Sequence, residues 1–307
     1  MTNNNLIKSL ASVERIAKKN KINRMINNPV KYIFSIMYRD FIYPFRKKEI
    51  VIKTKLFNGS PIIIALPAST DIFLTGGKSH ISEIRLAKYL IKNLHSDSTF
   101  IDVGAHYGYF SLIASDIVKD GKVYSFEPSS KSFNILKRNV SSLTNVTIFN
   151  KAVSQGNTPI AFYEFDNLHS EYNSTQISQF ENEDWFKAIK PNMQKIDSIS
   201  LSNFCIDNSI YPDIIKIDVE GFENEVIKGA ENLLTSSKKK PIIILEYLEP
   251  KRGNSAHKEA FSLLSRWGYS SNIISDSGDL IPENDIDGYL LKHSLESDNI
   301  VFIDREK

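Results

Sequence analysis

Two apolar stripes at helical spacing open the chain. The first predicts an amphipathic helix over residues 5–27, and its apolar face consists of Leu6, Leu10, Val13 and Ala17. Pro29 suits the first turn of a second helix, and Pro44 is expected to end it because proline lacks the N–H that a helix interior needs. The apolar stripe of this second helix consists of Ile33, Phe34, Met37 and Phe41.

Residues 49–57 then alternate apolar and polar side chains with period two, which is typical of a β-strand. The pair Asn58-Gly59 is a hairpin-turn signal that precedes the apolar run 61–66. We therefore expect an antiparallel β-hairpin here, followed by a helix over residues 82–94.

From residue 99 onward, short apolar runs alternate with helical periodicity. Strands are predicted at 99–105, 122–128, 146–153, 211–221 and 240–250, and helices at 109–118, 130–142, 222–235 and 255–267. This alternation is typical of an α/β fold, in which helices cover both faces of a mostly parallel sheet. Two more strands, 269–276 and 298–306, follow with no helix predicted between them, so we expect an antiparallel edge strand at the C-terminus.

Charge divides the chain into a basic arm and an acidic body. Of 38 Lys and Arg and 36 Asp and Glu in the 307 residues, the first 57 residues hold 13 basic and 3 acidic ones. No apolar run approaches the roughly 20 residues of a membrane span, and the first residues lack the apolar core of a secretory signal. The single cysteine, Cys205, has no disulfide partner in the chain. These features lead us to expect a soluble cytoplasmic protein.

The turn between the first strand and its helix reads Asp102-Val-Gly104-Ala-His106-Tyr-Gly108. In open α/β sheets, ligands bind at the carboxyl ends of the strands, and glycines let the backbone turn sharply there. The turn lacks the G-x-G-x-x-G fingerprint of dinucleotide binding. A carboxylate at Asp102 disfavours a pyrophosphate and suits a cationic ligand such as S-adenosylmethionine, and Glu127 can accept hydrogen bonds from ribose hydroxyls.

Several segments together resemble the FkbM-type S-adenosylmethionine-dependent methyltransferases. They are "FIDVGAHYGYFSL", "FEPSSKSFNILKRNV", "KIDSISLSNF" and, most specifically, "PDIIKIDVEGFENEVIKGA" followed by "PIIILE". The resemblance spans roughly residues 80–303. It implies a class I, Rossmann-like fold with a mostly parallel seven-stranded sheet and an antiparallel C-terminal strand, and O-methylation of glycan or natural-product hydroxyls. We therefore divide the chain into an N-terminal extension, 1–79, and a methyltransferase domain, 80–307.

The candidate site residues follow from their position at the strand ends and from the resemblance to the FkbM-type family. The cofactor is expected to bind at Asp102, Gly104, Ala105, His106, Gly108, Tyr109, Phe110, Glu127, Pro128, Asn150 and Ala152. At position 106 the similar proteins commonly carry Asn, so a side-chain contact of His106 with the methionine moiety is an open point. The candidates for a catalytic base are Asp218, Glu220, Glu246 and His169, and metal dependence is left open.

Other functions remain open at this point. The chain lacks the Asp/Asn-Pro-Pro-aromatic motif of amino-group methylation and the Pro-Cys of cytosine methylation, which favours oxygen as the acceptor. The alternatives are an N-methyltransferase acting on protein or nucleic acid, a non-catalytic scaffold and a nicotinamide enzyme. The expected partner is a saccharide or lipid-linked glycan. The basic arm could also bind an anionic membrane surface at the inner face, or a second copy of the chain, while the acidic body disfavours nucleic acid.

Overall fold

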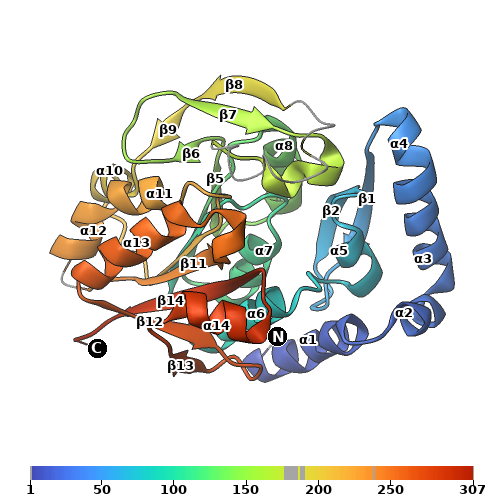
Figure 1. Cartoon of the computed structure of the whole chain (residues 1–307), viewed down its shortest axis with the longest axis horizontal. Helices are drawn as coiled ribbons and strands as arrows, with labels where there is room; N and C mark the ends of the chain where they lie inside the picture. Colours follow the sequence, from blue (N-terminus) through green and yellow to red (C-terminus); the bar gives the residue numbers. More distant parts are fainter. Residues whose placement is uncertain (1, 176–185, 187–190, 238, 307) are drawn as a thin grey trace.

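The computed structural model describes residues 2–175, 186, 191–237 and 239–306. Its centre is an eight-stranded sheet with the strand order β13-β12-β14-β11-β10-β3-β4-β5 (Figure 1). The strands are β3 (Thr99–Val103), β4 (Lys122–Phe126), β5 (Val146–Phe149), β10 (Ile214–Ile217), β11 (Ile242–Leu248), β12 (Tyr269–Ile274), β13 (Leu280–Pro282) and β14 (Ser297–Asp304).

The last strand, β14, is antiparallel as predicted, but the prediction that it forms an edge is wrong. It pairs antiparallel with both β11 and β12, and therefore lies between them. Two elements that the sequence pattern did not reveal, β13 and α14 (Ile286–His293), connect β12 to β14 and add an eighth strand to the expected seven. Because Ile300, Val301 and Phe302 are all fully buried, this apolar run suits a strand covered on both faces.

Helices cover both faces of the sheet, as the alternating pattern predicted. Adjacent strand residues face opposite sides, so Phe100 belongs to one apolar core and Ile101 to the other. The first core contains residues of α6 (Ile81–Asn93), α7 (Tyr109–Ile117) and α8 (Ser130–Val140). The second contains residues of α10 (Leu201–Asp207), α11 (Glu223–Gly229), α12 (Glu231–Ser236), α13 (Ser255–Arg266) and α14.

The N-terminal region forms more elements than the pattern predicted. They are α1 (Asn3–Ala17), α2 (Lys21–Asn27), α3 (Pro29–Ile36), the π-helix η1 (Met37–Ile42), α4 (Tyr43–Arg46), β1 (Ile50–Lys55), β2 (Pro61–Leu66) and α5 (Thr70–Thr75). The strands β1 and β2 pair antiparallel in the expected hairpin. Among the described residues, no helix combines the length and the apolar character that crossing a bilayer requires.

The single helix predicted over 5–27 is in fact two helices. The side-chain oxygen of Asn20 accepts a hydrogen bond from the N–H of Asn23 and so caps a new helix, α2. The guanidinium of Arg24 donates to the carbonyls of Ile16 and Lys19, which satisfies groups near the end of α1. Local polar groups therefore stabilise a break that the apolar periodicity does not show.

The prediction that Pro44 ends the second helix is also wrong. In the π-helix η1 the N–H of Tyr43 bonds to the carbonyl of Tyr38, five residues earlier. Pro44 then falls in the first turn of α4, where a missing N–H leaves no hydrogen bond unmade. The helical path consequently continues to Arg46.

The two predicted apolar stripes differ in burial. The stripe of α1 is confirmed, because Leu6, Leu10, Val13 and Ala17 are buried in the first core. In the stripe predicted for the second helix, Ile33, Met37 and Phe41 point away from the body and are at least half exposed, whereas Phe34, 40% exposed, packs on Phe73 of α5. The residues that face inward there are Ser35, Tyr38 and Tyr43.

The extension packs on the rest of the chain without a separate core. Leu6 and Leu10 of α1 and Ile62 and Ile64 of β2 belong to the same apolar cluster as Phe100. The boundary between residues 79 and 80 stays a prediction, although the two sides of it share this core.

The third predicted strand, 146–153, breaks after Phe149. Residues Val146–Phe149 join the main sheet as β5, whereas β6 (Ala152–Val153) pairs with β9 (Ser198–Ile199). A hairpin of β7 (Ile160–Glu164) and β8 (Asn192–Ile196) and the 3-10 helix η2 (Asn167–Tyr172) follow β6. These elements lie beyond the carboxyl ends of the strands (Figure 1), where η2 contributes to the wall of a cavity.

Candidate active site

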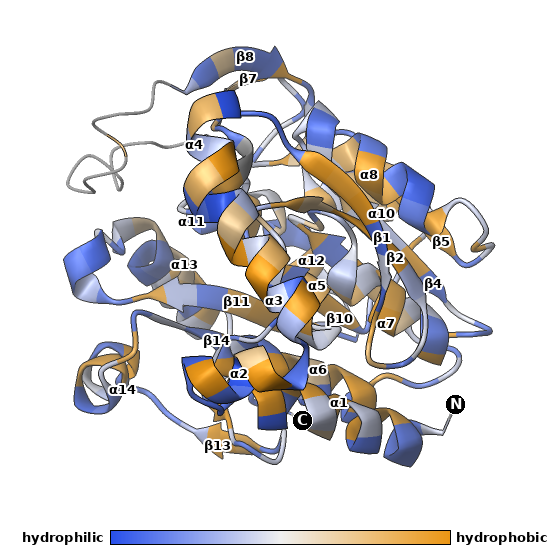
Figure 2. Ribbon diagram, turned by 90° about the vertical axis from the view of Figure 1, so that its right-hand side faces the viewer, coloured by the Kyte–Doolittle hydropathy of each residue, from blue (hydrophilic) through white to orange (hydrophobic). Residues whose placement is uncertain are grey.

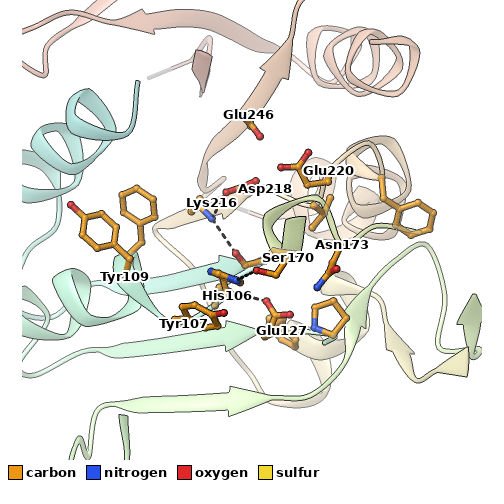
Figure 3. Close-up of a pocket in the computed structure, with 18 of the residues that line it drawn as sticks. His106, Tyr107, Tyr109, Glu127, Ser170, Asn173, Lys216, Asp218, Glu220 and Glu246 are labelled. Carbon is orange, nitrogen blue, oxygen red and sulfur yellow. Dashed lines mark hydrogen bonds and ion pairs between the residues drawn. The ribbon is translucent and has the colours of Figure 1, made fainter. Parts of the chain in front are cut away.

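A cavity of about 320 Å³ lies at the carboxyl ends of β3, β4, β10 and β11 (Figure 3). This is the position at which open α/β sheets bind ligands. Its wall includes the turn after β3, the ends of β4, β10 and β11, the helix α5 and the 3-10 helix η2. In Figure 3, Glu127 lies toward one end of the cavity and Glu246 toward the other.

The glycine turn after β3 is required by the close approach of two strand ends. Gly104 has φ +79°, and a Cβ on it would lie 1.8 Å from the carbonyl oxygen of Asp218 at the end of β10. Only glycine fits this position. At Gly108, with φ +88°, a Cβ would lie 2.6 Å from a side-chain methyl carbon of Leu136 in α8. Gly104 therefore lets two backbone segments approach each other, and Gly108 leaves room for the side chain of Leu136.

Glu127 is held in the cavity wall by two backbone hydrogen bonds. The N–H of His106 donates to its Oε2 at 2.8 Å, and the N–H of Ser129 donates to its Oε1 at 2.9 Å. Burial raises the pKa of Glu127 to about 7. Each carboxylate oxygen retains a lone pair for a further donor, so the group can accept hydrogen bonds from hydroxyls in the cavity.

His106 lies between Glu127 and the carboxylates of β10. Its Nε2 is 3.4 Å from Oγ of Ser170, and its ring stacks on Tyr107 with centroids 3.7 Å apart. Burial, together with the charge of Lys78, lowers the pKa of His106 to about 3. The imidazole is therefore neutral at physiological pH and acts as a hydrogen-bonding group in the wall.

Lys216 neutralises two carboxylates below the cavity. Its Nζ is 3.3 Å from Asp102 and 3.1 Å from Asp218, and its side chain is 3% exposed. Although burial alone lowers the pKa of Lys216, the charges of the two aspartates raise it above its ordinary value. The ammonium therefore remains charged and fixes the ends of β3 and β10 relative to each other.

Three carboxyl groups gather where β10 and β11 end. Oxygen atoms of Asp218, Glu220 and Glu246 all lie within 4.8 Å of one another, which is close enough to hold a divalent cation. Burial and the charge of Asp218 raise the pKa of Glu246 to about 8. Burial and the charges of Glu246 and Asp218 likewise raise the pKa of Glu220 well above its ordinary value.

Asp218 behaves differently from its two neighbours. Burial by itself raises the pKa of this group, but the ammonium groups of Lys216 and Lys78 outweigh burial and hold it below the ordinary value. Asp218 is thus the ionised member of the cluster, and a hydrogen bond joins it to Glu246. At neutral pH the cluster holds both a carboxylate that accepts hydrogen bonds and a carboxylic acid that donates them.

The turn that follows Asp218 is stabilised by a buried glutamate. Glu220 and Gly221 have φ values of +53° and +92°. Oε1 of Glu223 accepts hydrogen bonds from the N–H groups of Val219 and Gly221, at 3.3 and 3.2 Å. Its Oε2 is 3.2 Å from Nε2 of His257. The motif Asp-Val-Glu-Gly-Phe-Glu therefore builds the loop that presents Glu220 to the cavity.

The structure brings most of the predicted site residues to one cavity. Those that line it are Gly104, Ala105, His106, Tyr109, Phe110, Glu127, Pro128, Ala152, Asp218, Glu220 and Glu246. Lys151, which follows the third strand, lines it as well. The strand–turn logic therefore placed these residues at one cavity, and their roles in binding and catalysis stay predictions.

Four predicted site residues lie outside the cavity wall. Asp102 is 1% exposed and binds Lys216 and Ser111, because strand alternation turns it beneath α7. Gly108 packs on α8. Asn150 donates to the carbonyls of Glu127 and Pro128. His169 is paired with Asp166 at 2.7 Å.

These placements change the expected roles of all four residues. Asp102 cannot meet a cationic ligand directly, and His169 is not positioned as a base facing the cavity. Gly108 and Asn150 instead shape the two turns that carry His106 and Glu127. The sequence analysis expected each of these four residues to contact the cofactor or the acceptor directly. None of the four lines the described cavity, so the structure does not support that expectation.

Other cavity residues were missed because they come from segments without a recognisable motif. They are Asp71, Lys78, His80, Glu83, Phe162, Ser170, Asn173, Arg252, Glu296 and Ser297. Asp71 and Lys78 belong to the N-terminal extension. A sequence signal for these two residues was absent, since only the packing of the extension against the body brings them to the site.

The strand order and the cavity define a class of protein. A parallel sheet with a final antiparallel strand between the fifth and sixth, and a site at the end of the first and fourth strands, is the class I methyltransferase arrangement. The methyltransferase FkbM domain model matches residues 102–271. The chain belongs to this family.

Two curated relatives share part of this region. Methyltransferase sdnD of Sordaria araneosa is 27% identical over 169 residues, which cover 47% of this chain and 64% of that protein. The 2-O-methyltransferase NoeI of Sinorhizobium fredii (strain NBRC 101917 / NGR234) is 23% identical over 186 residues, or 58% of this chain and 76% of that protein. The chain thus spans less than two thirds of the length of sdnD.

A solved structure of methyltransferase FkbM from Methylobacillus flagellatus KT overlaps this chain with a TM-score of 0.43 and 14% identity. The overlap covers 77% of this chain and 53% of that one. The fold assignment stands on the strand order described above.

Proposed function

We propose that the chain transfers a methyl group from S-adenosylmethionine to a hydroxyl group of a polyhydroxylated acceptor, such as a saccharide, a glycan or a natural product. The observation that carries the proposal is the pairing, in one cavity, of Glu127 at one end with the Asp218, Glu220 and Glu246 cluster at the other. The first suits the ribose of the cofactor, and the second suits an acceptor rich in hydroxyls.

The residues present fit the cofactor. The two backbone bonds to Glu127 orient its carboxylate toward the cavity with lone pairs left for ribose hydroxyls. Lys151 and Ala152 follow β5 and line the cavity beside Pro128, where an adenine would lie. When bound, S-adenosylmethionine supplies a methyl group activated by the sulfonium charge. The surrounding carboxylates favour that positive charge.

The carboxyl cluster would handle the proton of the acceptor. Ionised Asp218 accepts a hydrogen bond from a hydroxyl, orients its oxygen and would take up its proton, and Glu246, with its pKa of about 8, is hydrogen-bonded to Asp218 and can exchange a proton with it close to neutral pH. A positioned base contributes roughly 10²–10⁴-fold to the rate of such a transfer. Orientation of the acceptor alone contributes further, because it removes the entropy cost of the encounter.

Oxygen is favoured over nitrogen as the acceptor atom by the relative NoeI, which is a 2-O-methyltransferase, and by the missing amino-methylation motif. A hydroxyl requires removal of its proton, for which the cluster is suited. The same carboxyl cluster could hold a divalent cation that orients two acceptor hydroxyls. Activity in the presence and absence of a chelator distinguishes the two arrangements.

The proposal is tested with Asp218→Asn and S-adenosylmethionine labelled in the methyl group. The unaltered chain and the variant are incubated with extracted glycans, lipids and small metabolites, and labelled products are analysed by mass spectrometry. We expect an O-linked methyl group with the unaltered chain and a turnover lower by about 10²-fold with Asp218→Asn, as for loss of a base. Calorimetry should give cofactor affinities within a few-fold of each other.

Asp276→Asn serves as the matched control, since this side chain is 69% exposed and is not part of the cavity wall. Its turnover should match that of the unaltered chain. Methyl label recovered on nitrogen of protein or nucleic acid would replace the proposal with N-methylation. Full activity of Asp218→Asn would remove Asp218 from the chemistry.

A further inference from the structure

Exposed apolar residues follow the helices α2, α3, η1 and α4. We call the stripe that they form the outer face and define it by the residues Ile22, Ile26, Val30, Ile33, Met37, Phe41 and Phe45, each at least half exposed. They recur every three or four residues within α2 and, after the break at Asn28, from α3 through η1 to α4, which keeps the members of each segment on one side of it. The side chain of Phe45 is the most exposed, at 88%.

The outer face is exposed because the opposite side of the same helices is fixed to the body. Nζ of Lys31 donates to the carbonyl of Phe73 in α5 at 3.1 Å and lies over its ring. The ring of Phe34 meets the ring of Phe73 edge-on. Tyr43 is 1% exposed, and its hydroxyl accepts a hydrogen bond from the N–H of Leu168. These contacts set the orientation of the stripe.

Basic residues surround the stripe almost without acidic ones. Residues 18–48 contain nine Lys and Arg and a single acidic residue, Asp40, which is paired with Arg39. The exposed members are Lys18, Lys21, Arg39, Arg46, Lys47 and Lys48. Figure 2 shows the predominantly hydrophobic ribbon of α3 between hydrophilic segments of α2 and of the end of α4.

This combination identifies the kind of partner. An apolar stripe that is flanked by Lys and Arg is the signature of a helix lying in the plane of a membrane interface. Anionic lipids attract such a surface, whereas a second copy of the chain would place two strongly positive faces against each other. We propose that the outer face docks the chain on the surface of an anionic bilayer.

The docked orientation brings the bilayer close to the candidate site. Helix α5 separates the outer face from the cavity: Phe73 packs against Phe34 of α3, while Asp71 and Ile72 line the cavity. An acceptor anchored in the membrane would therefore meet the cavity from the side of α5. The docking itself does not depend on the proposed methyl transfer and is tested without it.

The first test is co-sedimentation of the full chain with vesicles of equal parts phosphatidylglycerol and phosphatidylcholine, compared with vesicles of phosphatidylcholine alone. At low salt we expect the partition coefficient to be at least about tenfold higher for the anionic vesicles, since each nearby Lys or Arg adds about fivefold. Binding should fall in 1 M salt, where the Debye length shrinks to about 3 Å.

Matched variants distinguish binding through the outer face from non-specific adsorption to vesicles. Phe41→Ser with Phe45→Ser removes two exposed rings, and Arg46→Glu with Lys48→Glu reverses two charges. Each pair should reduce anionic binding by about tenfold or more. The control pair, Ile206→Ser with Tyr211→Ser, alters residues that are 62% and 76% exposed in and beside α10, away from the outer face, and should bind as the unaltered chain does.

Circular dichroism verifies that the variants are folded. We expect them to fold because every replaced side chain is exposed. Equal binding to neutral and anionic vesicles, or control variants as impaired as the outer-face variants, would overturn the proposal. So would a stable dimer that the Phe41 and Phe45 replacements dissociate, because the outer face would then be an interface between copies of the chain.

Discussion

The carboxyl group of Glu246 makes a prediction that needs no substrate. Burial and the charge of Asp218 raise its pKa from 4.5 to about 8. The folded chain therefore keeps a proton that the unfolded chain releases near pH 4.5. Between these pH values the unfolded state binds fewer protons than the folded state, so the free energy of unfolding falls as the pH rises.

The magnitude follows from the two pKa values. Between them the free energy of unfolding should fall by about 1.4 kcal/mol for each pH unit. From pH 5 to pH 9 the loss due to Glu246 amounts to about 4 kcal/mol, and above pH 9 it levels off. The Glu246→Gln variant keeps a hydrogen-bond donor for Asp218 but cannot ionise at position 246. Its free energy of unfolding should therefore not fall with pH on account of this residue.

The assay is chemical denaturation followed by far-UV circular dichroism from pH 5 to pH 9. The quantity of interest is the difference in unfolding free energy between Glu246→Gln and the unaltered chain, in which the titrations of groups outside the carboxyl cluster cancel. It should grow in favour of the variant by about 4 kcal/mol over this range. Glu296→Gln, at the exposed rim of the cavity, should show a flat difference. A difference for Glu246→Gln that stays constant within about 0.5 kcal/mol would refute the reasoning.

Two further substitutions examine Gly104 in the turn after β3 and Glu127, which accepts a hydrogen bond from that turn. Glu127→Ala should weaken binding of S-adenosylmethionine by about 1.5–3 kcal/mol, the range for hydrogen bonds to charged groups; an unchanged calorimetric affinity would remove Glu127 from the cofactor site. Gly104→Ala should destabilise the chain by more than about 1 kcal/mol, because its Cβ would collide with the carbonyl of Asp218. Gly156→Ala, with nothing within 4 Å of the new Cβ, is the matched control in the same thermal or chemical melt, and equal effects of the two would contradict the clash.

The helix stripes show why one prediction was confirmed and another was wrong. The stripes of α1 and of α3 with η1 have similar periodicity, yet Leu10 is fully buried and Met37 is 52% exposed. Periodicity shows that a helix has an apolar side. It does not show whether the fold provides a surface to cover that side, and here the aromatic ring of Tyr38 and the hydroxyl of Ser35 face the body instead.

Among the candidate site residues, too, some lie where the sequence predicted and others do not. Glu127 and Asp218 could be predicted because parallel strands end at one edge of the sheet, so residues that follow them must lie close together. Asp102 was expected at the ligand for the same reason, but its carboxylate lies under α7 with Lys216. The side to which a strand residue points depends on the pleat, and one residue of difference decides between the cavity and the core.

The sequence by itself determined the alternation of strands and helices, the glycine turn and the motif that forms the loop after β10. These are local features, since hydrophobic period and backbone freedom act over a few neighbouring residues. Only the tertiary structure decided that Glu246 holds its proton near neutral pH, that Lys78 and Ser170 reach the cavity, and that the outer face stays uncovered. Burial and charge interactions depend on distances in space, and those distances join residues that lie far apart along the chain.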